Sequence, residues 1–99
     1  MKIEEISGVG EYTSEIEKLK EGERKLYRVE GKVFLVENKN TIEVRTDEKL
    51  GKLLAEKYES VMQSRYFGRG GIEIVPTGQL EEREIEDLVR LSYNMSKEK

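Results

Sequence analysis

The sequence predicts a single α+β domain: a two-layer α/β sandwich in which helices cover one face of a mainly antiparallel, five-stranded sheet. Short β-prone runs follow one another closely and are separated by turn signals, which is typical of hairpins. Two later segments carry apolar residues at helical spacing. With 99 residues the chain has room for one domain over residues 1–99, and the expected order of elements is α-β-β-β-α-β-β-α.

The first 25 residues are expected to form an N-terminal helical segment with a less regular pattern than the rest. Ser14 and Glu17 stand three residues apart, as in a capping box at the start of a helix. Gly22 suits the position just after a helix, where a left-handed residue ends it. These signals predict a helix over residues 14–21.

A meander of three strands is expected next. Glu30 and Gly31 form a tight hairpin signal between the first two β-prone runs, and an Asn-containing turn precedes the third. Apolar and polar residues alternate in the third run, so Ile42 and Val44 share one face while the other face is wet. The expected strands cover residues 26–29, 32–36 and 41–45.

The next helix is expected to begin after Asp47, whose carboxylate can cap its first turn. Four apolar residues then recur at helical spacing and form one stripe toward the core, namely Leu50, Leu53, Leu54 and Tyr58. Two more strands are expected at residues 61–67 and 72–75. They are joined by a glycine-rich turn over residues 68–71.

Pro76 separates the last strand from a closing helix over about residues 80–96, since proline cannot sit inside a central strand. Glutamates fill the first turns of this helix, where the helix dipole favours negative charge. Its buried face is expected to consist of Ile85, Leu88, Val89, Ser92 and Tyr93, widened by Leu91 and Met95.

The absence of cysteine and histidine narrows the chemistry that this chain can do. Thiolate zinc sites, cysteine nucleophiles and Ser-His-Asp arrangements all need one of these residues, so we expect a non-catalytic protein without a cofactor. The acidic run from Glu81 to Asp87 lacks the spacing of a calcium loop, and no metal site is expected. No apolar run approaches the ~20 residues of a membrane helix, and the first residues show no signal-peptide pattern. We therefore expect no membrane partner and a cytoplasmic location.

Charge is unevenly distributed along the chain, whose formal net charge is −3. Residues 18–69 carry thirteen basic side chains against nine acidic ones, whereas both flanking segments are acidic. The middle of the chain thus has a weak basic bias rather than a polybasic arm. Charged residues make up 39% of the whole, a composition common in proteins from hot environments.

The segment from Arg65 to Gly71 interleaves arginines with aromatic rings beside glycines. Single-stranded nucleic-acid sites use this combination, with cations for phosphates, rings for base stacking and glycines for close backbone approach. The candidate nucleic-acid-binding residues are Lys52, Lys57, Arg65, Tyr66, Phe67 and Arg69, where the lysines extend the surface from the preceding helix. The alternative is structural: a hairpin in which Tyr66 or Phe67 packs inward, beside a helix whose lysines are solvated.

A second basic cluster lies within residues 18–32. It consists of Lys18, Lys20, Arg24, Lys25, Arg28 and Lys32. Because glutamates interrupt this cluster, we expect its cations to be used in local ion pairs.

Three short motifs carry a family resemblance: the run Gly31-Lys32-Val33-Phe34, a strand that ends at Arg45, and the closing segment 88–93. Together they resemble the YjbR/MmcQ-like family over about residues 26–95. The passage 75–80 is similar to the related TfoX N-terminal domain. The resemblance implies an α/β sandwich with an antiparallel sheet and a DNA-binding role, which members are given largely from their fold. Where the family usually has a His-Trp pair, this chain reads Arg69-Gly70-Gly71-Ile72.

These observations favour a small, non-catalytic binding module whose partner is nucleic acid. The alternative is a protein-interaction module or a homodimer that uses an edge or an open face of the sheet. Unpaired strand edges can recruit another chain, so this alternative stays open.

Overall fold

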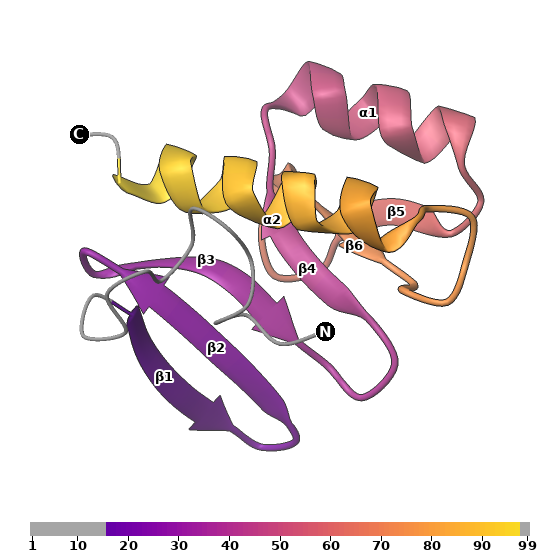
Figure 1. Ribbon diagram of the computed structural model, residues 1–99. Coiled ribbons are helices and arrows are strands. Elements are labelled where there is room, and N and C mark those ends of the chain that lie inside the picture. The colour runs from indigo at the N-terminus through magenta and orange to yellow at the C-terminus, as the bar shows by residue number, and fades with distance from the viewer. Residues whose placement is uncertain (1–15, 98–99) are drawn as a thin grey trace.

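The computed structural model describes residues 16–97 and shows one six-stranded sheet with two helices on one of its faces (Figure 1). The strands are β1 (Ile16–Glu21), β2 (Arg24–Val29), β3 (Lys32–Glu37), β4 (Ile42–Arg45), β5 (Val61–Ser64) and β6 (Gly68–Ile74), and the helices are α1 (Glu48–Lys57) and α2 (Glu82–Lys97). The spatial order is β1-β2-β3-β4-β6-β5, and all neighbouring pairs are antiparallel. The α+β class and the antiparallel sheet are confirmed, whereas the five-strand count is wrong.

The additional strand is β1, which falls where a helix over residues 14–21 was expected. It pairs with β2 along its whole length. Gly22 does adopt a left-handed backbone, with φ of +64°, but it turns a hairpin instead of ending a helix. The helical prediction depended on a cap and a glycine at the two ends, and cross-strand pairing outweighed them. Ser14, the expected cap, lies outside the described residues.

The hairpin between β2 and β3 is confirmed. Glu30 and Gly31 both have positive φ, +50° and +80°, as a type I′ turn requires. Ile42 and Val44 of β4 are buried in the main core, as their alternation predicted. The turn and the inner face of the meander therefore follow the sequence signals. Its other face, which was expected to be wet, instead buries Leu26, Val33 and Val36.

The helix α1 has the expected cap, because Asp47 Oδ1 accepts a hydrogen bond of 2.8 Å from the Leu50 N–H. Its expected apolar stripe is confirmed at Leu54 and Tyr58, which pack against the core, and is wrong at Leu53, which is 60% exposed. In α2, Leu91 is exposed and does not widen the buried face. The buried residues of α2 are Ile85, Val89, Ser92, Tyr93 and Ser96.

The main core lies between the helices and the sheet. Phe34 of β3 meets Tyr93 of α2 edge to face, with ring centroids 5.2 Å apart. Ser92 supplies the polar link between these layers: its hydroxyl donates to the Phe34 C=O at 2.6 Å and accepts from the Arg45 N–H at 2.8 Å. Those two positions lie just past the end of the β3–β4 ladder, so Ser92 satisfies backbone groups that the strands no longer pair.

The last hairpin turns earlier than its glycines suggested. Residues 65–67 form the turn, and residues 68–71 belong to β6. Gly71 is needed inside the strand, because a Cβ there would lie 2.6 Å from both the Phe67 Cβ and the Val44 carbonyl oxygen. The Phe67 side chain lies against Gly71 and packs on a small apolar cluster of Leu26, Val33 and Val36. The turn thus folds over the sheet face that the helices leave uncovered.

Candidate nucleic-acid interface

The six candidate residues do not form one patch. Arg65, Tyr66 and Phe67 lie in the β5–β6 turn, against the face of the sheet without helices. Lys52 and Lys57 lie on α1, and Arg69 lies in β6.

Arg65 forms an ion pair with a buried carboxylate of the same chain. Its guanidinium donates to both carboxylate oxygens of Glu73, at 2.9 and 2.8 Å. The hydrogen bond and the charge of Glu73 raise the pKa of Arg65. Thr41 donates to the same carboxylate at 2.7 Å, and Glu73 is only 2% exposed. Arg65 therefore neutralises an internal charge, although 75% of its own side chain remains exposed.

A second buried carboxylate, Glu43, lies directly opposite Glu73 on the neighbouring strand. It accepts hydrogen bonds from the Asn38 side chain at 2.8 Å, the Ser64 hydroxyl at 2.8 Å and the Tyr66 N–H at 2.9 Å. Burial alone would raise the pKa of Glu43, but these hydrogen bonds outweigh it and lower the pKa below its ordinary value.

Sequence reasoning missed both carboxylates, because it expected this face of β4 to be wet. The available signal was a glutamate between two apolar residues, which occurs at residues 42–44 and again at 72–74. Such alternation shows that the glutamate lies on the opposite face of the strand from its neighbours, but it does not show whether other residues cover that face.

The two aromatic rings of the turn are stacked on arginines of the same chain. The Arg24 guanidinium lies 5.3 Å from the Tyr66 ring centroid, and that of Arg45 lies 4.8 Å from the Phe67 centroid. Arg45 is fixed there by a hydrogen bond of 2.6 Å to the Val33 C=O. Phe67 thus packs inward, as expected if this segment is a structural hairpin. Both rings already have a cationic partner within the chain.

Lys52 and Arg69 come together at a hollow of about 460 Å³ between α1 and the β5–β6 hairpin, here called the α1 hollow. It is lined by Glu48, Gly51, Lys52, Ala55, Gln63, Arg69 and Gly71. Gly51 allows the close approach of α1, since a Cβ there would lie 2.8 Å from Thr46 Oγ1 and 3.3 Å from Ile72 Cγ2. Among residues 16–97, no acidic group lies within ion-pair distance of either cation.

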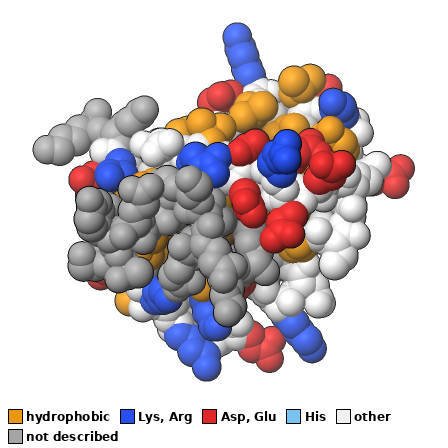
Figure 2. All heavy atoms as spheres, in the orientation of Figure 1, with side chains coloured by type: hydrophobic (Ala, Val, Ile, Leu, Met, Phe, Trp, Pro, Cys, Tyr) orange, Lys and Arg blue, Asp and Glu red, His pale blue; other side chains and the backbone are white. Residues whose placement is uncertain are grey.

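The outer surface of α1 is weakly basic, because three exposed lysines, including Lys52, stand against the exposed Glu48 and Glu56. Lys49 and Lys57 are exposed on the helix, and the Lys57 ammonium lies 5.2 Å from the Tyr58 ring centroid. The other helix is different: acidic side chains gather over α2 on the face shown in Figure 2. The acidic residues of α2 are Glu82, Glu84, Glu86 and Asp87. Of the two helices, α1 is therefore the one suited to a polyanion.

The second basic cluster is divided between the two faces of the β1–β2 hairpin. Arg24 pairs with Glu21, and Arg28 pairs with Glu17 at 2.6 Å, which confirms the expected local ion pairs for the arginines. Lys20 lies opposite Lys25 on the other face of the same strands. The arginines of this cluster are therefore already neutralised.

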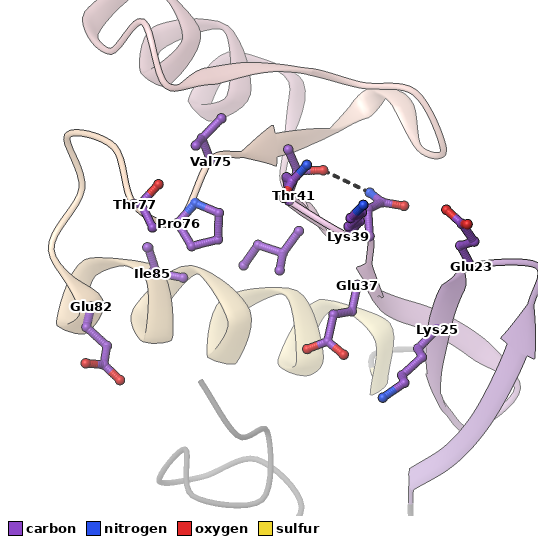
Figure 3. Close-up of a pocket in the computed structure, with 13 residues that line it drawn as sticks. Glu23, Lys25, Glu37, Lys39, Thr41, Val75, Pro76, Thr77, Glu82 and Ile85 are labelled. Atoms are coloured by element: carbon purple, nitrogen blue, oxygen red, sulfur yellow. Dashed lines mark hydrogen bonds between the residues drawn. The ribbon is translucent and has the colours of Figure 1, made fainter.

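A larger hollow than the α1 hollow, about 830 Å³, lies beside the start of α2 and has mixed charge (Figure 3). Pro76 and Ile85 contribute apolar surface. Its charged residues are Lys25 and Lys39 against Glu23, Glu37 and Glu82. With more acidic than basic side chains, this hollow does not suit a polyanion. The α1 hollow, by contrast, has two cations against one glutamate.

Within residues 16–97, no three or more His, Cys, Asp or Glu side chains are grouped so as to hold a metal ion. No helix in that part is long and apolar enough to cross a membrane.

The chain matches no protein-family model and no curated protein. It is similar to the crystal structure of a protein from Pseudomonas syringae, determined by the Northeast Structural Genomics Consortium, with a TM-score of 0.71 and 15% sequence identity. The similarity covers 89% of this chain and 91% of that one. At this identity it shows a shared fold and nothing about activity.

Proposed function

We propose that this protein is a small, non-catalytic module that binds nucleic acid through the α1 hollow and the outer surface of α1. The observation that carries the proposal is that Lys52 and Arg69, seventeen residues apart in sequence, line one hollow. Within residues 16–97, neither cation has an acidic group at ion-pair distance. Other arginines of the protein, including Arg24, Arg28 and Arg65, are held in ion pairs. Cations left without acidic partners remain available for phosphates.

The arrangement favours phosphate contacts over base stacking. Tyr66 and Phe67 are engaged by arginines of the same chain, so they are poor platforms for bases. The residues that line the α1 hollow include no aromatic ring, so its cations Lys52 and Arg69 are the groups that it offers to the phosphates of a nucleic acid. We therefore expect binding that depends strongly on salt and weakly on sequence.

Membership of the YjbR/MmcQ-like family, with the TfoX N-terminal domain as second choice, is part of the same proposal. The motifs that resemble these families imply an antiparallel α/β sandwich, and the six-stranded sheet is compatible with one. The DNA-binding role given to family members supports nucleic acid as the partner. We also place the protein in the cytoplasm, where it would meet nucleic acid.

The test is a fluorescence-anisotropy titration with labelled single- and double-stranded DNA and RNA at about 50 mM and about 200 mM salt. For two lost phosphate contacts, Lys52→Ala with Arg69→Ala should reduce the ratio of the two affinities by about tenfold. The matched control is Lys39→Ala with Arg83→Ala, which removes the same charge at exposed positions outside the α1 hollow.

Three results would contradict the proposal. The first is no binding by the unaltered protein at the lower salt concentration. The second is an equal loss in the control variant, which would indicate a general charge effect. The third is unchanged affinity and salt dependence in Lys52→Ala with Arg69→Ala.

A further inference from the structure

The α1 hollow contains one carboxylate, Glu48, which a site for phosphate alone would not need. Its other polar side chains are Lys52, Gln63 and Arg69. An ionised carboxylate only accepts hydrogen bonds, and the same is true of the oxygens of a phosphodiester. Glu48 therefore repels a phosphate and cannot bond to it. A ligand satisfies this side chain only if it also brings a hydrogen-bond donor.

Glu48 differs from the neighbouring Asp47 in that the fold does not use its carboxylate. The Asp47 side chain caps α1 by accepting a hydrogen bond of 2.8 Å from the Leu50 N–H. Among the described residues, by contrast, no hydrogen bond or ion pair engages the carboxylate of Glu48. Its side chain is exposed and lines the α1 hollow. The carboxylate is thus open to a donor on a ligand.

The spacing of Glu48 and Lys52 matches two adjacent groups of a ribonucleotide. These residues stand four apart on α1, so they lie on the same side of the helix with Cβ atoms about 5–6 Å apart. In RNA the 2′-hydroxyl is on the sugar carbon next to the one that carries the following phosphate. A phosphate held by Lys52 and Arg69 therefore brings a hydroxyl donor within the reach of Glu48. The hollow, about 460 Å³, has room for one such unit of a strand.

We infer that Glu48 accepts a hydrogen bond from a ribose 2′-hydroxyl, so that the α1 hollow binds RNA in preference to DNA. This inference rests on the proposed function and specifies its nucleic acid. A deoxyribose offers no donor at this position, so DNA meets the charge of Glu48 without compensation. RNA is thus preferred over the DNA that the family resemblance implies.

The amino group of a base is the other donor that a nucleic acid could offer to a carboxylate, as cytosine does to glutamate. That contact would make binding depend on the base, whereas a hydroxyl contact makes it depend on the sugar. The hydroxyl is the same on every ribonucleotide, which agrees with the weak dependence on sequence expected of this site. Uracil has no amino group, so strands of uridine separate the two sources.

The test is fluorescence anisotropy of the full chain with three labelled single strands of equal length, at about 50 mM salt. The strands are oligouridylate, its deoxy form and its 2′-fluoro form, which keeps an RNA-like sugar pucker but lacks the O–H donor. The unaltered protein should bind the first strand about fivefold more tightly than the other two, as expected for one hydrogen bond. Glu48→Ala should abolish this preference. It should also raise the affinity for the deoxy strand, because it removes the uncompensated charge.

Glu56→Ala is the matched control, because it removes the same charge from an exposed position of α1 that does not line the hollow. It should change the affinities for the three strands by one common factor and leave their ratios unchanged. A role of Glu48 limited to the dipole of α1 would give the same result in Glu48→Ala, with all three affinities shifted equally. That result would overturn the inference.

The remaining outcomes separate this inference from the proposed function. Equal affinities of the unaltered protein for oligouridylate and its deoxy form would overturn the inference and leave the proposed function in place. A 2′-fluoro strand that binds as tightly as oligouridylate, or a preference that survives Glu48→Ala, would do the same. No measurable binding of any of the three strands would contradict the proposed function and the inference together.

Discussion

On one face of the sheet two helices bury an apolar core, whereas on the other a short turn covers a pair of glutamates. The helix-covered face is closed by aliphatic and aromatic contacts, such as that of Phe34 with Tyr93. The uncovered face has the small cluster around Phe67 and, beside it, Glu43 and Glu73 with their hydrogen-bond donors. Apolar burial supplies most of the stability of a fold, while buried polar groups mainly cost stability when a partner is removed. The two faces should therefore respond differently to mutation and to pH.

The largest effect is expected from Phe34→Ala. Phe34 is fully buried, so its truncation should lower the free energy of unfolding by about 3–5 kcal/mol. Equilibrium denaturation in urea measures this loss. Phe67→Ala is the companion variant on the uncovered face, and it should cost less because Phe67 is half-buried. Equal losses for the two variants would contradict the assignment of the main core to the helix-covered face.

A smaller effect, with a pH signature, is expected at Glu43. The pKa of Glu43 is lower in the folded protein than its ordinary value of 4.5, so the carboxylate stabilises the fold above that pH. This contribution should be lost as the pH falls from about the ordinary pKa through the folded pKa. Glu43→Gln should remove that pH dependence and cost about 1–3 kcal/mol near neutral pH, because its amide cannot accept all the donors.

The measurement is the denaturation midpoint as a function of pH for both proteins. Glu56→Gln, at an exposed position of α1, is the control and should leave the fall of the midpoint at acid pH unchanged. If the midpoint of Glu43→Gln fell at acid pH as steeply as that of the unaltered protein, the hydrogen bonds to Glu43 would not be the source of the pKa shift.

The elements of the helix-covered face could be predicted because their signals are local. The Glu30-Gly31 turn, the alternation around Ile42 and the cap at Asp47 each act within a few residues. β1 was missed because its six residues contain only two apolar side chains, which is a weak strand signal. The capping pattern that predicted a helix there is also a local signal, so the sequence alone could not decide between the two. What decides between them is pairing with β2, a contact that a local pattern does not contain.

The uncovered face could not be predicted, because its contacts join distant parts of the chain. Glu73 is reached by Thr41 from 32 residues away, and Glu43 by Ser64 from 21 residues away. The arginine-aromatic pattern around Arg65 was recognised, but nothing in it shows that Arg24 and Arg45 would stack on its rings. The α1 hollow had a weaker signal, since Lys52 and Arg69 were both candidates while their convergence depends on how α1 packs on β6.

The smallest effect tests whether the helix-covered side can loosen by itself. Asp47→Ala removes the hydrogen bond to the Leu50 N–H and should lower stability by about 1 kcal/mol. Because α1 contacts β5 and β6 but contributes nothing to the Glu43 network, native-state hydrogen exchange should rise in α1 before it rises in β4. Asp47→Asn retains a capping side chain and should restore most of the protection. Equal loss of protection in α1 and β4 would mean that the two faces of the sheet open together. The two faces would then differ in the residues that they bury but would unfold as one cooperative unit.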